Sequence, residues 1–288
     1  MLRPNGSAMT RRKMNLKKLY KHDNGKQIWR ILPTSNNKIV IEERDLKTKE
    51  VFFSCLEVES GKKIFNEFQF DEKNWIGIES VYNDMIFFHF YGKPDMPAHK
   101  SIFAFDIPSK SVLWQNDNYV FSFIDDDKVY CYQQRFESRV FFALDYLTGN
   151  VVEDFGTDLA RFQHLREKAD EDFRKQNYLF PDYFKRSDSV SNKYEKYLQQ
   201  ILTDNIIKGD VNYLIIKNLL MFNYHEVSKI NTLNNIFTAV DLAKNKILLK
   251  ETLDKNLINL MPESFFVKDN YLFLIVDKTK LFVSQIIE

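Results

Sequence analysis

The 288-residue chain carries 41 lysines and arginines against 40 aspartates and glutamates, which gives a net charge of +1. This balance provides no overall attraction to nucleic acid, so nucleic acid is not expected as a partner. No apolar run approaches the length needed to cross a bilayer, so a membrane is not expected as a partner either. With 44% hydrophobic residues and only 8 Gly and 7 Pro, the composition excludes a disordered chain.

Residues 1–18 are rich in lysine and arginine and contain no acidic residue. No apolar stretch follows these charges, which excludes a secretory signal. We predict a flexible basic leader over residues 1–18. The two cysteines, Cys55 and Cys131, fall in predicted strands as buried thiols, and a reducing, cytoplasmic location is expected.

One sequence unit recurs along the chain and is clearest around Asp145. The apolar Phe141 and the small Ala143 precede this acid, and Gly149 follows four residues after it. The carboxylate can accept hydrogen bonds from the backbone N–H groups just ahead, and glycine tolerates a positive φ angle. The unit therefore predicts a strand, a tight turn and a second strand. Further copies are centred on Glu57, Asp106 and Asp241.

Each unit is preceded by a second apolar run that begins at a polar turn residue. These runs span residues 37–41, 84–90, 127–132, 218–224 and 269–276. Each repeat is therefore predicted to hold about four strands, and the repeats recur about every 40 to 50 residues. Such a period is typical of propeller blades. We predict an all-β fold with a helical insertion, built as a small β-propeller for which five blades are favoured and six are the alternative.

Two copies of the unit carry a further motif, Ala104-Phe105-Asp106 with Trp114 and Ala143-Leu144-Asp145 with Gly149. This motif resembles the quinoprotein-type (pyrroloquinoline-quinone-like) propeller repeat. Over most of residues 20–288 the chain is more closely similar to an uncharacterised bacterial domain-of-unknown-function family with the same repeat. The resemblance implies a fold and no activity. The adjacent cysteine pair of the catalytic quinoproteins is missing and only three tryptophans are present, so no quinone and no other cofactor is expected.

The strand pattern stops over residues 155–205. Leu159, Phe162 and Leu165 recur at helical spacing, and a second apolar set does so further along. The segment predicts a pair of helices inserted between blades three and four of a single domain spanning residues 19–288. We expect the domain to fold as a β protein when a short linker replaces this helical pair.

The last repeat is incomplete, with about three predicted strands. Near the N-terminus, Gln27-Ile28-Trp29 resembles the second half of a repeat. We predict that this segment pairs with the C-terminal strands, so that N- and C-terminal strands close the propeller and leave no exposed edge.

Loops on a rigid scaffold are where binding residues concentrate, and the richest predicted loop spans residues 89–100. The candidate ligand-binding residues of this and the equivalent loops are His89, Tyr91, His99, Arg135, Tyr224, His225 and Glu226. Three histidines and a glutamate could form a metal site or an acid–base pair. Their spacing matches no metal motif, so we assign no catalytic and no metal-binding residue. The consecutive acids at 125–127 lack the glycine and glutamate of a calcium loop and predict a plain turn.

Two functional hypotheses follow from these residues. The favoured one is a non-enzymatic scaffold that binds a protein or a small molecule through its loop face. The alternative is a hydrolase or lyase acting on a sugar-like substrate, with His89, His99 and His225 in the central funnel. The two differ in one observation, because an enzyme needs these side chains within a few ångströms of one another around a pocket.

Overall fold

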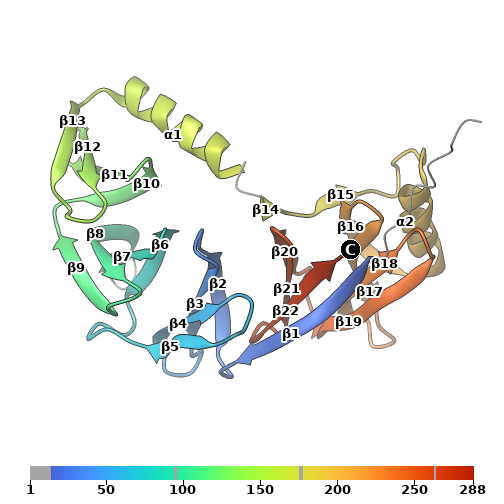
Figure 1. The fold of residues 1–288 in the computed structure, drawn as a ribbon. Helices are drawn as coiled ribbons and strands as arrows, with labels where there is room; N and C mark the ends of the chain where they lie inside the picture. Colours follow the sequence, from blue (N-terminus) through green and yellow to red (C-terminus); the bar gives the residue numbers. More distant parts are fainter. Residues whose placement is uncertain (1–13, 94–95, 175–177, 263) are drawn as a thin grey trace, which may run out of the picture. The chain divides into compact units, whose positions relative to one another are not determined.

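The computed structural model describes residues 14–93, 96–174, 178–262 and 264–288 (Figure 1). The chain divides into two compact units, one of residues 23–177 and one that joins the segment up to His22 to residues 178–288. Over the described residues the secondary structure consists of five antiparallel sheets, each of four or five strands, and two helices.

The unit of residues 23–177 contains three four-stranded sheets, and in each the strands follow chain order. The first sheet is formed by β2 (Gln27–Pro33), β3 (Lys38–Arg44), β4 (Val51–Glu57) and β5 (Lys63–Phe68). The second is formed by β6 (Ile76–Tyr82), β7 (Met85–Lys93), β8 (Met96–Asp106) and β9 (Ser111–Asn116). The third is formed by β10 (Val120–Asp125), β11 (Lys128–Gln134), β12 (Arg139–Asp145) and β13 (Val151–Gly156), and α1 (Leu159–Arg174) follows it.

The other unit contains two five-stranded sheets. One has the order β15 (Asp182–Phe184), β16 (Ile207–Ile216), β17 (Leu219–Val227), β18 (Leu233–Asp241) and β19 (Lys246–Leu257). The second has the order β1 (Asn15–Asp23), β22 (Lys280–Ile287), β21 (Tyr271–Val276), β20 (Phe265–Lys268) and β14 (Tyr178–Leu179). The helix α2 (Lys193–Asp204) precedes β16 and begins with a capping box between Asn192 and Glu195.

The recurring acids form the predicted turns. The Asp145 carboxylate accepts hydrogen bonds from the backbone N–H groups of Leu147 and Thr148, at 3.1 and 2.8 Å. Gly149 then adopts a φ of 70°, as the turn requires. Lys110 occupies the equivalent position after Asp106 with a φ of 55°, so the same turn forms there without glycine. The interpretation of these acids as turn formers is confirmed.

Trp114 is the aromatic residue that ends the copy of the repeat around Asp106, and its contacts show what it does there. Its indole N–H donates to the Tyr146 carbonyl at 2.9 Å, and the ring covers Gly149. A Cβ at Gly149 would lie 2.6 Å from the Trp114 ring. The tryptophan of the second sheet therefore packs directly on the turn of the third, where only glycine leaves room.

Replacing Gly149 by alanine is therefore expected to cost about 2–5 kcal/mol of unfolding free energy, from the left-handed backbone together with overpacking against Trp114. Gly25 is a matched control, because its φ is also 70° and a Cβ there would meet nothing within 4 Å. Gly25→Ala should cost only about 1–2 kcal/mol. All three tryptophans, Trp29, Trp75 and Trp114, lie in this unit, so urea unfolding followed by tryptophan fluorescence compares the two variants. Equal costs would contradict the packing role of Trp114.

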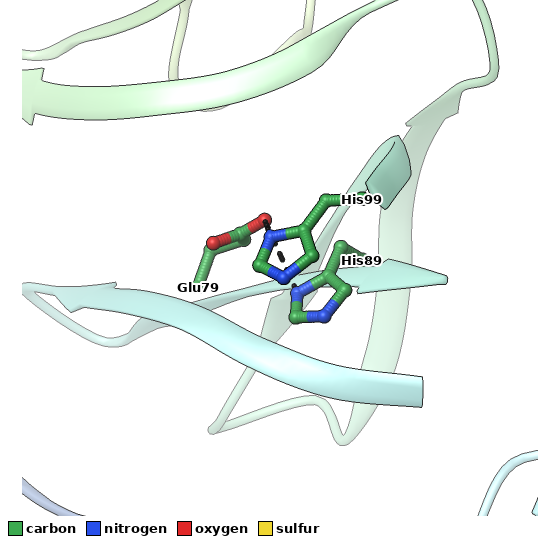
Figure 2. Close-up of side chains that lie close together, drawn as sticks. All are labelled: Glu79, His89 and His99. Carbon is green, nitrogen blue, oxygen red and sulfur yellow. Dashed lines mark hydrogen bonds and ion pairs between the residues drawn. The ribbon is translucent and has the colours of Figure 1, made fainter. Parts of the chain in front are cut away.

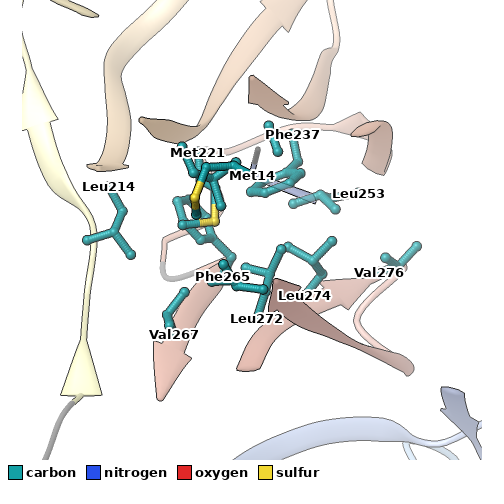
Figure 3. Close-up of a cluster of buried hydrophobic side chains, with 13 residues drawn as sticks. Met14, Leu214, Met221, Phe237, Leu253, Phe265, Val267, Leu272, Leu274 and Val276 are labelled. Carbon is teal, nitrogen blue, oxygen red and sulfur yellow. The ribbon is translucent and has the colours of Figure 1, made fainter. Parts of the chain in front are cut away.

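Neighbouring sheets within a unit share apolar cores. In the unit of residues 23–177, Phe53 from β4 packs edge-on against Phe88 from β7, at 4.8 Å between ring centroids. In the other unit, Met221 and Phe237 of one sheet meet Phe265 and Leu272 of the other (Figure 3). Paired sheets that bury their facing side chains in this way form a multi-sheet β-sandwich.

The two helices contribute to these cores. Phe162 and Ala169 of α1 are buried against β10 to β13. Leu198 and Leu202 of α2 are buried in a cluster with Phe222 of β17. Both helices lie within residues 155–205, where the helical insertion is predicted.

The predicted small β-propeller, closed by N- and C-terminal strands, is wrong. The described residues form five separate sheets in two compact units, and no closed propeller is found among them. The turn chemistry of the repeat specifies each four-stranded meander, because it acts within a few residues of the turn. Closure of a ring depends on packing between distant sheets, which the local pattern does not encode.

The predicted partner of the C-terminal strands is also wrong. Gln27, Ile28 and Trp29 belong to β2, whose partner is β3. The strand that joins the C-terminal sheet is β1, which pairs with β22. Asn15 to Lys18 of the predicted basic leader are part of this strand, and residues 1–13 lie outside the described residues.

The helices and the two cysteines can be compared with the expectations about membranes and disulfides. Among the described residues, neither helix is long and apolar enough to cross a membrane. Cys55 and Cys131 are both fully buried in strands, as predicted, and neither forms a disulfide. Burial raises the pKa of the Cys55 thiol to about 12, which leaves it inert at neutral pH.

Candidate functional site

Three adjacent strands of the second sheet bring a carboxylate and two imidazoles together. Glu79 lies on β6, His89 on β7 and His99 on β8 (Figure 2). In the registry of β6 with β7, Ile78 pairs with Phe88 and Ser80 with Phe87, so Glu79 is the extra residue of a β-bulge. A second irregularity, between Phe88 and Phe90, adds an extra residue to β8 opposite His89. Because bulges re-aim side chains, they account for the convergence of residues that a regular sheet would separate.

The donor atoms of the three side chains lie within 4.8 Å of one another. Glu79 Oε1 is 2.7 Å from His99 Nδ1 and 3.1 Å from His89 Nδ1. The two imidazole rings stack, with 3.6 Å between their centroids and 11° between their planes. Figure 2 shows both rings directed at the same carboxylate oxygen. We call this group the Glu79–His89–His99 cluster.

His89 is the buried centre of the cluster. Its side chain is fully buried, whereas Glu79 is 11% and His99 31% exposed. Neither ring nitrogen of His89 makes a hydrogen bond among the described residues, and its Nδ1 has only the ion-pair contact with Glu79 Oε1. Each buried polar group left unpaired costs about 1–3 kcal/mol. Such a side chain requires an explanation beyond packing.

A glycine makes room for the His89 ring. Gly77 pairs with His89 across β6 and β7, and a Cβ at Gly77 would lie 3.0 Å from His89 Cε1 and 3.2 Å from Nε2. Such contacts are closer than side-chain packing normally allows. The imidazole is therefore seated directly on the backbone of the neighbouring strand.

The charges of the cluster are coupled. Burial by itself would raise the pKa of Glu79, but His89 and His99 outweigh that effect and hold the pKa below its ordinary value. A carboxylate that stays ionised beside two imidazoles is the protonation state in which all three groups can act as metal ligands.

Polar side chains of β3 lie beside the cluster. The Glu42 carboxylate is 1% exposed and accepts a hydrogen bond from the Ile78 N–H at 3.1 Å, next to Glu79. The Arg44 guanidinium donates to Glu42 Oε1 through two nitrogens, at 3.1 and 2.8 Å. These contacts fix β3 and β6 around the cluster.

Of the seven residues predicted as ligand-binding, the structure brings His89, Tyr91 and His99 together. Tyr91 lies edge-on to both imidazoles, with centroids 4.9 Å from His89 and 5.5 Å from His99. These three residues lie on strands and not in a loop, because β7 and β8 continue to Lys93 and from Met96. Arg135 is exposed after β11 and donates to Gln133 at 2.9 Å.

The remaining three predicted residues, Tyr224, His225 and Glu226, lie on β17 of the other unit. Tyr224 is buried beside Phe222, and burial raises its pKa. The His225 ring is 3% exposed, and its Nε2 accepts a hydrogen bond from the Met261 N–H at 2.9 Å. His225 therefore serves as a local structural acceptor.

The protonation of His225 predicts a pH dependence of stability. Burial lowers its pKa from the ordinary 6.5, so the unfolded chain binds a proton first as the pH falls. The free energy of unfolding of this unit should therefore decrease below about pH 6.5, by up to about 1.4 kcal/mol per pH unit. His225→Gln keeps an acceptor for Met261 and should flatten this decrease, whereas exposed His164→Gln should not. Hydrogen exchange of the Met261 amide at about pH 7.5 and 5.5 measures this free energy at the two pH values. If His225→Gln loses as much stability between them as the wild type, His225 is not the group responsible.

Sequence reasoning missed Glu79. A single acidic residue in residues 76–82 is normally interpreted as a solvent-facing strand residue. The bulge that turns Glu79 toward the histidines cannot be predicted from the sequence. The available signal was the alternation of Gly77 and Glu79 with Ile76 and Ile78, which places a small and an acidic residue on one face.

Residues 32–114 match the model of a family described as Domain of unknown function (DUF4905). The matched segment contains Glu79, His89 and His99. The expected resemblance to an uncharacterised domain family is confirmed over residues 32–114. Its extent over most of residues 20–288, the quinoprotein-like repeat and the bacterial source stay predictions. A comparison with curated proteins finds no match.

Two solved structures align with this chain at low similarity. A eukaryotic initiation factor aligns at 7% identity and a TM-score of 0.33 over 91% of this chain and 55% of its own. A prolyl endopeptidase aligns at 11% identity and a TM-score of 0.34 over 88% of this chain and 42% of its own. The chain thus spans about half the length of these proteins or less, and the TM-scores carry no argument about function.

Proposed function

We propose that the protein is a binding protein whose ligand is a divalent transition-metal ion, held by Glu79, His89 and His99. The observation that carries this proposal is His89, an imidazole with no exposed surface whose two ring nitrogens lack hydrogen-bond partners among the described residues. A metal ion bound to one of these nitrogens would satisfy it.

The donor set fits such an ion. Two imidazoles and a carboxylate suit Zn²⁺ and the neighbouring first-row metals rather than Mg²⁺ or Ca²⁺, which prefer oxygen. Zn²⁺ bonds of about 2.0–2.2 Å place tetrahedral ligands about 3.3 Å apart. The 3.1 Å separation between the Glu79 oxygen and His89 Nδ1 is close to this spacing, whereas the 2.7 Å hydrogen bond to His99 Nδ1 would have to lengthen when an ion replaces its proton.

The surroundings also support binding. His99 is the exposed member of the cluster and leaves a route from solvent, while Gly77 makes room for the His89 ring and Glu42 holds the strand that carries Glu79. A site positioned by strands, with neighbours that orient its ligands, is typical of specific metal binding. The proposal keeps the small-molecule branch of the favoured hypothesis, moves the ligand from the loop face to strands, and replaces the expectation of no metal-binding residue.

Isothermal titration calorimetry with Zn²⁺ tests this function. We expect one saturable site in the wild type, with affinity lowered about 10–100-fold or lost in Glu79→Gln and His99→Ala. His164→Ala is the matched control, because this histidine is exposed on α1. The proposal fails if the wild type shows no saturable binding, or if His164→Ala weakens binding as much as His99→Ala.

A further inference from the structure

The proposed metal site has room for a ligand from outside the chain. Three protein ligands are the number found in sites that keep an open coordination position. The cluster is closed at His89, with no exposed surface, and open at His99, with 31%. A fourth ligand would therefore enter on the side where His99 and Tyr91 face each other.

The charge of the site selects the kind of ligand. A divalent ion with one carboxylate and two neutral imidazoles carries a net charge of about +1. The nearby Arg44 is paired with Glu42 through two hydrogen bonds, so this pair adds no net charge. A monoanion restores neutrality in a partly buried site, where an uncompensated charge is costly.

Tyr91 is placed to donate a hydrogen bond to such an anion. Its hydroxyl lies 3.7 Å from the position a Cβ would take at Gly77, which is also 3.2 Å from His89 Nε2. A phenol O–H is a hydrogen-bond donor, so Tyr91 can donate its own proton to an acceptor there. Trp75 packs edge-on against the Tyr91 ring at 6.4 Å and holds it in place.

From these contacts, and resting on the proposed metal-binding function, we infer that the bound metal takes a small carboxylate as an exchangeable ligand and that Tyr91 donates a hydrogen bond to it. The carboxylate supplies one oxygen to the metal and an acceptor to Tyr91. Tyr91 is thus a specificity-determining residue that favours an anion over an uncharged ligand of the same shape.

The test uses the full chain loaded with Co²⁺, whose visible absorption reports its coordination. Sodium acetate at constant ionic strength should produce a saturable spectral change, whereas acetamide, a neutral molecule of nearly the same shape, should not. Tyr91→Phe keeps the ring that packs on both imidazoles, and at a Co²⁺ concentration that saturates each protein it should bind acetate about tenfold more weakly than the wild type. Tyr132→Phe, on β11 of the third sheet, is the control and should bind acetate like the wild type.

The outcomes separate the two proposals. If Co²⁺ does not bind, the metal-binding function itself is wrong and the carboxylate proposal falls with it. If Co²⁺ binds but acetate leaves the spectrum unchanged, or acetamide acts like acetate, the carboxylate proposal is wrong and the metal site stands. If Tyr91→Phe binds acetate as tightly as the wild type, Tyr91 has no part in recognising the ligand.

Discussion

Replacing Phe162 by alanine is expected to lower the free energy of unfolding of the unit of residues 23–177 by about 3–5 kcal/mol. The Phe162 side chain on α1 is 4% exposed, and its ring stacks on Phe141 at 4.4 Å and meets Phe123 at 5.3 Å. Its removal leaves a cavity between the helix and the third sheet that rigid strands cannot collapse to fill.

Phe136→Ala is the matched control, because Phe136 is 99% exposed and its loss should change stability by less than about 0.5 kcal/mol. Urea unfolding followed by tryptophan fluorescence measures both variants. Similar stability in the two variants would show that α1 does not contribute to the core. Because α1 and α2 both bury side chains, replacement of residues 155–205 by a short linker is now expected to destabilise the protein, contrary to the expectation from sequence.

Gly77→Ala is expected to lower the affinity for Zn²⁺ about 10–100-fold and to cost about 1–3 kcal/mol of unfolding free energy. The new methyl group would lie 3.0 Å from His89 Cε1, so either the imidazole or the strand must move. The ring cannot move freely, because it is fully buried and stacked on His99.

A double-mutant cycle isolates this contact. In an His89→Ala background the ring is absent, so adding Gly77→Ala should cost close to nothing in unfolding free energy. Tryptophan fluorescence during urea unfolding gives the four stabilities of the cycle. The same cost of Gly77→Ala in both backgrounds would mean that the glycine serves the strand and not the histidine.

The local structure could be predicted well from the sequence. Asp145 and Gly149 form the turn expected from their spacing, and the apolar runs on either side form the expected strands. The helical spacing of Leu159, Phe162 and Leu165 predicted α1. These features depend on hydrogen bonds and backbone angles within a few residues, which the local sequence determines.

The arrangement of sheets could not be predicted in the same way. The motif Gln27-Ile28-Trp29 resembles half a repeat, yet the strand that joins β22 is β1, which carries no copy of the motif. Pairing between the two ends of the chain depends on which strand best covers an exposed edge, and that choice lies outside any local pattern.

The candidate site was also predicted only in part, where it depends on local sequence. His89, Tyr91 and His99 were predicted from their residue types and their closeness in sequence. Glu79 was missed because a bulge in β6 turns it toward the histidines, and the residue types in β6 do not predict a bulge. His225 and Glu226 were grouped with the other histidines on an assumed propeller, and the structure places them on β17 of the other unit.

The central claim is that Glu79, His89 and His99 bind one metal ion, and anomalous diffraction from crystals grown with Zn²⁺ tests it most directly. We expect one strong peak at the zinc absorption edge, with the ion about 2.0–2.2 Å from a carboxylate oxygen of Glu79 and from one nitrogen of each imidazole. Binding should also rotate the His89 and His99 rings out of their 3.6 Å stack. A map without a peak at these residues, with His89 still unpaired, would contradict the claim.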